Sequence, residues 1–235
     1  MESFSQDEPE AGAPLAHYST GRLTAAQAAT IARWRARLQQ DKPLPGLRPK
    51  GPVLRMLGID DRPPASCSDV IASVVKDLLD QAPPAELDIA RYHYRAVQAQ
   101  KRAGQGDVTE HAAIHQPVSF YLPQDLADHY ERLRRDTYRA MIKFIQELKE
   151  RALEEYPDEE PGKKKARALF VWMQLAKEGL PPGPARITGG VIARMAIDRV
   201  ARRSVDRVLK AAVDYADDVH EQPHRARRDM HRLAP

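Results

Sequence analysis

Apolar side chains recur at three- and four-residue spacing along most of the chain, which is the period of an amphipathic α-helix. The clearest stripe begins near Ser68 and consists of Val70, Ile71, Val74, Val75, Leu78 and Leu79. Weaker stripes of the same period predict further helices at about 24–40, 84–103, 163–178, 187–203 and 204–220. Thr24 and Thr188 stand where two of these helices begin and suit their N-caps. The pattern predicts a mainly α fold, a multi-helix bundle.

Other segments interrupt the helical period. Prolines crowd residues 41–65 and predict an extended connection, in which residues 53–59 form one short apolar turn or strand. Residues 1–21 mix acidic residues with Pro and Gly and predict a disordered tail, and residues 221–235 predict a basic flexible tail. Between the tails we expect an N-terminal helical region over 22–107 and a second helical domain over 108–220. No internal repeat is evident.

Residues 118–122, which lie between two prolines, alternate apolar and polar side chains. The alternation predicts a strand with Ser119 and Tyr121 on one face. Its other face carries Val118, Phe120 and Leu122. A five-residue strand needs a partner to be stable. No second segment alternates as clearly, so we expect this strand to pair with the same strand of a second molecule around a two-fold axis.

A long helix is predicted to follow the strand directly. It starts at Pro123-Gln124-Asp125 and extends to about Tyr156. Unbroken, it would be about 50 Å long at about 1.5 Å per residue. Alternatively, the chain breaks at Asp136-Thr137 and a new helix begins there.

Composition adds limits on location and chemistry. The chain has 235 residues, of which 42% are hydrophobic and 30% charged, and a net charge of +4. Cys67 is the single cysteine, which excludes an intramolecular disulfide or a thiolate metal cluster. Apolar runs are shorter than the ~20 residues of a membrane span, and the N-terminus lacks an apolar signal segment. We therefore expect a cytoplasmic bacterial protein without a membrane partner.

Catalytic and cofactor motifs are absent from the sequence. It contains no Gly-rich phosphate loop, no His-Glu-x-x-His and no nucleophile elbow. His220 and His224 have a spacing that suits two metal ligands on a helix, but Pro223 lies between them and disrupts that geometry. We expect no enzyme activity, no cofactor and no bound metal.

The segment Val118-Ser119-Phe120-Tyr121-Leu122-Pro123-Gln124-Asp125-Leu126 resembles the strand-to-helix junction of ribbon-helix-helix DNA-binding proteins. Members of that family are intertwined dimers that lay an antiparallel ribbon in the major groove. Residues 187–197 look like the family's second helix. The resemblance implies that Ser119 and Tyr121 face DNA and that Thr188 and Gly189 contact phosphate.

The chain departs from the family between the two helices. The family joins them with a short turn, whereas more than thirty residues intervene here, so residues 108–220 would form a ribbon-helix-helix-like domain with a long insertion. The alternative second helix is the one that would begin at Asp136-Thr137 and use Met141, Ile142 and Ile145.

A cluster of arginines gives a second candidate for phosphate contact. It consists of Arg194, Arg199, Arg202, Arg203 and Arg207, four of which can share one helix face. We assign Arg194, Arg202 and Arg203 to DNA binding. The alternative is that the cluster forms ion pairs with Asp198 and Asp206.

These observations favour a homodimeric, sequence-specific duplex-DNA-binding protein, either a transcription regulator or a plasmid-partition factor that binds a centromere. Partition members of the family carry a flexible N-terminal segment that engages a Walker-type ATPase, and residues 1–21 with Arg22 would take that part. The alternative function is a helical protein–protein adaptor that does not bind nucleic acid, in which the apolar stripes of residues 70–79 and 126–152 serve protein partners.

Overall fold

The computed structural model describes residues 15–40, 66–81, 83–104, 116–157, 161–184, 187–188, 190–216 and 218–219. The fold is mainly helical, with one small antiparallel sheet of two strands in these residues. The strands are β1 (Leu15–Ser19) and β2 (Ser119–Pro123). The helices are α1 (Ala25–Leu38), α3 (Cys67–Gln81), α4 (Glu86–Gly104), α5 (Gln124–Glu155), α6 (Pro161–Lys177), α7 (Gly190–Val200) and a further helix over 205–216.

Local capping signals explain where several helices begin. Thr24 caps α1 as predicted, since its side chain accepts from the amide of Gln27 while the Gln27 side chain accepts from the amide of Thr24. Ser66 and Asp69 form a similar pair at the start of α3. Ser204 accepts from the amide of Arg207 at 3.3 Å and opens the helix over 205–216. The predicted helices are therefore confirmed to within a few residues at their ends.

Helix α5 is continuous over 32 residues, so the alternative break at Asp136-Thr137 is wrong. The Thr137 side chain is fully buried, and its hydroxyl donates to the carbonyl of Leu133 at 2.8 Å. This bond to the carbonyl four residues earlier satisfies the buried hydroxyl without interrupting the helix. A second helix starting at Thr137, as in a short ribbon-helix-helix unit, does not form.

The strand at 118–122 is confirmed as β2, but the expectation about its partner is corrected. β2 pairs antiparallel with β1 of the same chain, in a register that runs from Leu15↔Pro123 to Ser19↔Ser119. Residues 15–19 therefore do not belong to a disordered tail. Residues 1–14, the short apolar segment at 53–59 and the basic tail at 221–235 lie outside the described residues.

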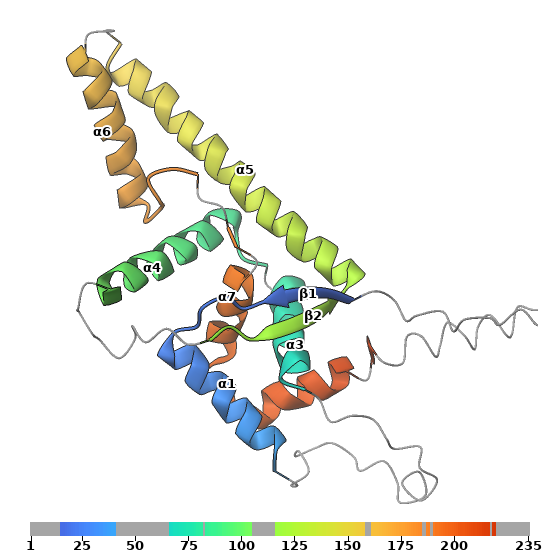
Figure 1. Ribbon diagram of the computed structural model, residues 1–235. Coiled ribbons are helices and arrows are strands. Elements are labelled where there is room, and N and C mark those ends of the chain that lie inside the picture. The colour runs from blue at the N-terminus through green and yellow to red at the C-terminus, as the bar shows by residue number, and fades with distance from the viewer. Residues whose placement is uncertain are drawn as a thin grey trace, which may run out of the picture.

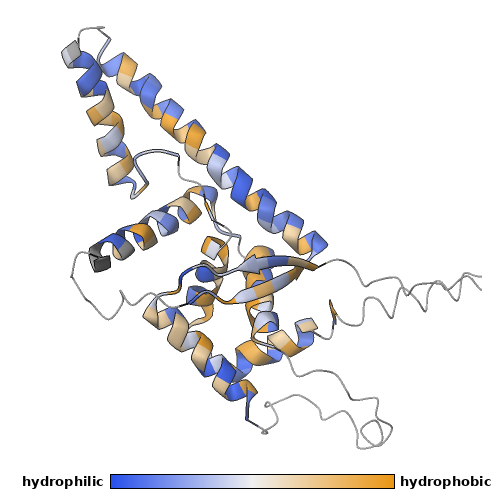
Figure 2. Cartoon of the chain, in the orientation of Figure 1, coloured by the Kyte–Doolittle hydropathy of each residue, from blue (hydrophilic) through white to orange (hydrophobic). Residues whose placement is uncertain are grey.

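The ribbon of β1 and β2 lies over α3 and α7, with α1 below them, while α5 and α6 project as an arm (Figure 1). Figure 2 shows apolar residues concentrated in α3 and α7, under the ribbon. The main core draws residues from β2, α1, α3, α7 and the helix over 205–216, so it spans both sides of position 107. A smaller core between α4, α5 and α6 comprises Ala90, Met141, Ile145, Leu148, Leu175 and Leu180.

Across the described part of the chain, no helix combines the length and apolarity that a membrane span requires.

Candidate nucleic-acid interface

The inner face of the ribbon is sealed by core packing. Phe120 and Leu122 are completely buried, as the alternation predicts. Tyr18 of β1 stacks on Phe120 with ring centroids 5.8 Å apart and lies 4.9 Å from the ring of Tyr130 on α5. Burial raises the pKa of Tyr18, and a hydrogen bond to Glu131 adds to the increase. This aromatic layer fixes the ribbon on the helices, so its outer face has a defined orientation.

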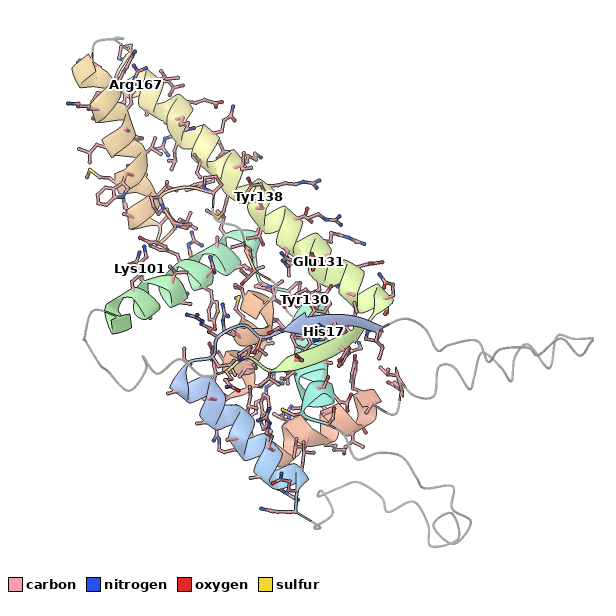
Figure 3. The ribbon with its side chains drawn as sticks, viewed as in Figure 1. His17, Lys101, Tyr130, Glu131, Tyr138 and Arg167 are labelled. Carbon is pink, nitrogen blue, oxygen red and sulfur yellow. The ribbon has the colours of Figure 1, made fainter. Side chains whose placement is uncertain are left out.

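The outer face presents hydroxyl groups and aromatic rings. Ser119 and Tyr121 are exposed, the latter at 47%, and His17 is the exposed neighbour of Tyr121 on β1. The two rings lie 5.2 Å apart, centroid to centroid. Figure 3 places His17 on the ribbon, and Tyr138 and Arg167 farther out along the arm. The two predicted readout residues and His17 thus share one surface, which we call the ribbon face: Leu15, His17, Ser19, Ser119 and Tyr121.

Both edges of β2 have partners within the chain. On one edge the amide of Thr20 donates to the carbonyl of Val118 at 3.0 Å, next to the paired residues of β1. On the other edge the amide of Tyr121 donates to the hydroxyl of Ser68 at 3.2 Å, at the start of α3. A second molecule would have to displace β1 or α3 to pair with β2.

The start of α7 holds the turn that follows β1. Gly190 lies so close to this turn that a β-carbon at position 190 would stand 2.1 Å from the carbonyl oxygen of Thr20. Gly21 has a positive φ of 66°, which favours glycine. Arg194 donates from Nη1 to the Thr20 carbonyl at 2.9 Å. These contacts tie β1 to α7.

The assignment of Arg194 to DNA is therefore corrected. Its side chain is 7% exposed, and its guanidinium also reaches the carbonyl of Arg22 at 3.4 Å. Backbone carbonyls take the charge-assisted hydrogen bonds that a phosphate would need. Arg194 positions the β1 turn, whereas Arg22 itself is exposed.

The other residues predicted to contact phosphate, where the structure describes them, lie at opposite ends of α7. Thr188 is exposed at the start of α7, where its carbonyl accepts from the amide of Val191 at 3.1 Å, so it lies at the ribbon end of that helix. Gly189 lies outside the described residues. Arg202 is exposed and Arg203 partly exposed, but both follow the opposite end of α7. The structure does not bring these two arginines to the ribbon face.

The ion pairs around the end of α7 differ from the predicted pairing of the arginine cluster with Asp198 and Asp206. Arg203 pairs with Asp77 of α3 at 2.9 Å, so its charge is already balanced. Asp206 pairs with Arg37 of α1 at 2.8 Å. Ion pairing therefore occurs around the end of α7, with partners on α1 and α3 that spacing within one helix cannot reveal.

A partly buried polar cluster links Gln27, Tyr92 and Asp198. The Gln27 side chain donates to the Tyr92 hydroxyl at 2.9 Å and to Asp198 at 3.0 Å, and the same hydroxyl donates to Asp198 at 2.5 Å. Burial raises the pKa of Tyr92, with the Asp198 carboxylate adding to the effect. The nearby His93 has a pKa lowered by burial and by Arg194. This cluster joins α1, α4 and α7 through side-chain hydrogen bonds and so stabilises the helices that support the ribbon.

Sequence reasoning missed β1 and with it His17 and Ser19. The segment does alternate, with Ala16 and Tyr18 facing inward. However, Ala is a weak apolar signal, and the segment follows an acidic, Pro-containing stretch. A search for any five-residue alternation able to match residues 119–123 would have found it. No group of three or more potential metal ligands occurs among the residues that the structure describes.

No protein-family model, no curated protein and no solved structure matches this chain.

Proposed function

We propose that this chain binds duplex DNA in a sequence-specific manner through the ribbon face. The observation that carries the proposal is an antiparallel two-stranded ribbon whose inner face packs on the core and whose outer face presents Ser119, Tyr121 and His17. A two-stranded ribbon fits the major groove, where hydroxyl and imidazole groups can hydrogen-bond to base edges. The rigid support below the strands supplies the preorganisation that such readout requires.

The surroundings of the ribbon face give further support. Helices α3 and α7 both begin beside the ribbon, at Ser68 and near Thr188 respectively. Helix N-termini carry partial positive charge, which suits phosphate groups on either side of a groove. Exposed Arg22 adds a full positive charge close to the end of β1. The ribbon would read the DNA sequence, and the two helix N-termini and Arg22 would contact the DNA backbone.

In the cell this activity would serve a transcription regulator or a plasmid-partition factor that binds a centromere. A homodimer would bind adjacent DNA sites, and its contacts would lie outside β2, whose two edges are both occupied. For the partition role, the segment before β1 together with Arg22 would engage a Walker-type ATPase.

Duplex-DNA binding at two salt concentrations tests the proposal. Random and self-derived genomic fragments are titrated with the full chain and with the double variant Ser119→Ala/Tyr121→Ala. We expect binding that weakens steeply with salt, a preferred fragment, and loss of that preference in the double variant. Tyr138→Ala, which removes an exposed tyrosine from α5, is the matched control and should bind normally. Equal binding by all three proteins would contradict the proposal.

The alternative function, a helical adaptor, draws support from a different surface. Leu153, Leu169, Trp172 and Met173 are exposed on the arm. Several arm residues line a shallow apolar groove, including Leu153, Val171 and Trp172. The stripe at 70–79, considered earlier for partner binding, is instead buried in the core. An adaptor would use the arm, and substitutions in the arm, not in the ribbon, would then abolish its activity.

A further inference from the structure

Each strand of the ribbon is followed along the chain by helices that contribute to the main core. Among them, α1 and α3 follow β1, and α5 and, after α6, α7 follow β2. Figure 1 shows α1 and α5 leaving opposite ends of the ribbon, while α3 and α7 lie together beneath it. Because His17 stands opposite Tyr121 in the antiparallel register, an axis through this pair exchanges the two strands.

Some of the helix contacts follow the same exchange, whereas the contacts of α1 with α3 and of α3 with β2 have no counterparts of similar extent in the other half. Helix α3 packs against α7, which the axis relates to each other. Helix α1 contacts α7, and its counterpart α5 contacts α3. The start of α3 meets β2 at Ser68 and Tyr121, and the start of α7 meets the end of β1 at Gly190 and Thr20. Each second helix thus begins against the strand of the other half.

The sequences of α3 and α7 carry a trace of the same relation. Val70-Ile71-Ala72 in α3 matches Val191-Ile192-Ala193 in α7, and each triplet is buried in the main core. An aspartate follows the first valine by seven positions in both helices, as Asp77 and as Asp198. Both aspartates accept from side chains of other elements, Arg203 and Gln27 respectively. The match is too short to be evident in the sequence without the structure.

We propose that residues 15–81 and 118–200 are two halves of one pseudo-symmetric ribbon-helix-helix-like unit, so that a single chain forms the complete ribbon. In this arrangement His17 is the counterpart of Tyr121, and it contacts DNA from the first strand. The DNA contact rests on the proposed function, whereas the pairing of the halves does not. The halves differ in several ways: five residues separate β1 from α1 whereas α5 follows β2 directly, α5 has 32 residues against 14 in α1, and α6 lies between α5 and α7.

Disulfide trapping tests the pairing of the halves. The pairs His17–Tyr121 and Ser19–Ser119 are non-hydrogen-bonded pairs of the ribbon, since the amide of Tyr121 points away from β1 to Ser68. Cα atoms in such pairs lie about 4.5 Å apart, within the range that a disulfide spans. Full-length protein carrying Cys67→Ser receives either His17→Cys/Tyr121→Cys or Ser19→Cys/Ser119→Cys and is then oxidised.

We expect both double variants to lose their two free thiols and to run as monomers on a non-reducing gel. The single variant Tyr121→Cys in the same background should give no disulfide-linked dimer. Linked dimers as the main product in the double variants, or efficient linking by Tyr121→Cys alone, would mean that the ribbon forms between two chains and would overturn the proposal. Free thiols persisting in both double variants would overturn it as well.

A DNA-binding experiment distinguishes this inference from the proposed function. If wild-type protein binds its preferred fragment, His17→Ala should weaken binding about 10-fold, as should Tyr121→Ala. A loss in Tyr121→Ala with none in His17→Ala would leave the function standing and overturn the role of the first strand. No binding by the wild type, with monomeric disulfides in both pairs, would refute the proposed function while supporting the two-half fold.

Discussion

The ribbon and the α5–α6 arm are both antiparallel pairs, but the ribbon buries its large apolar side chains whereas the arm exposes several of them. Under the ribbon, Phe120 and Leu122 have no exposed surface. On the arm, Trp172 is 54% exposed and Met173 56% exposed. The apolar side of the ribbon packs against α3 and the first part of α5, whereas the arm has exposed apolar side chains in addition to its small core.

The two pairs also differ in the distance along the chain that each must close. Helices α5 and α6 are neighbours in sequence, and the contacts between them are local. In the described residues, α1, α3 and α4 lie between β1 and β2, and the pairing of the strands depends on α3 and α7 being in place. We therefore expect substitutions under the ribbon to destabilise the whole body, and substitutions on the arm surface to leave it folded.

The largest effect should come from the inner face of the ribbon. Phe120→Ala removes a fully buried ring and should reduce the unfolding free energy by about 3–5 kcal/mol. Leu153→Ala, on the exposed side of the arm, should change it by less than about 0.5 kcal/mol. Urea denaturation followed by circular dichroism measures both. Similar losses in the two variants would show that the arm is as tightly integrated as the ribbon.

A second large effect should follow from crowding the contact between β1 and α7. Gly190→Ala places a methyl group against the backbone of Thr20 and Gly21, and we expect a loss of about 1–3 kcal/mol. Gly162 in α6 has open space around its Cα, so Gly162→Ala should be neutral or stabilising by about 0.5–1 kcal/mol. Thermal unfolding compares the pair. An unchanged melting temperature in Gly190→Ala would contradict the close contact.

The polar cluster at Tyr92 should give an intermediate, pH-dependent effect. Tyr92→Phe removes the hydrogen bonds to Gln27 and Asp198 and should cost about 1–2 kcal/mol near neutral pH. Since the pKa of Tyr92 is raised in the folded protein, unfolded chains release this proton first as pH rises. The stabilisation is complete below about pH 10 and declines above it. Stability measured from pH 8 upward should fall less steeply in Tyr92→Phe, and parallel curves would exclude this role.

The smallest effect on stability should come from the arm surface. Trp172→Gln/Met173→Gln should alter the unfolding free energy by less than about 0.5 kcal/mol, because both side chains are more than half exposed. DNA binding by this variant should equal that of the wild type. Loss of DNA binding without loss of stability would move the functional surface from the ribbon to the arm.

The sequence predicted what local signals encode. Periodicity and capping residues located the helices, and alternation located β2 with the correct faces for Ser119 and Tyr121. The partner of β2 was not predictable in this way, because pairing with β1 depends on a fold that brings distant segments together. Arg194 was misassigned for a related reason: the carbonyls of Thr20 and Arg22 that bury it come from a turn far away in the chain.

Chemical footprinting of the ribbon tests the central claim most directly. The imidazole of His17 is modified with diethyl pyrocarbonate in the full-length protein, with and without the preferred duplex fragment, and the extent is read by mass spectrometry. Binding through the ribbon face predicts that DNA protects His17, while an oxidative label on Tyr138 of the arm is unchanged. Unaltered modification of His17 in a DNA complex, or protection confined to Tyr138, would contradict it.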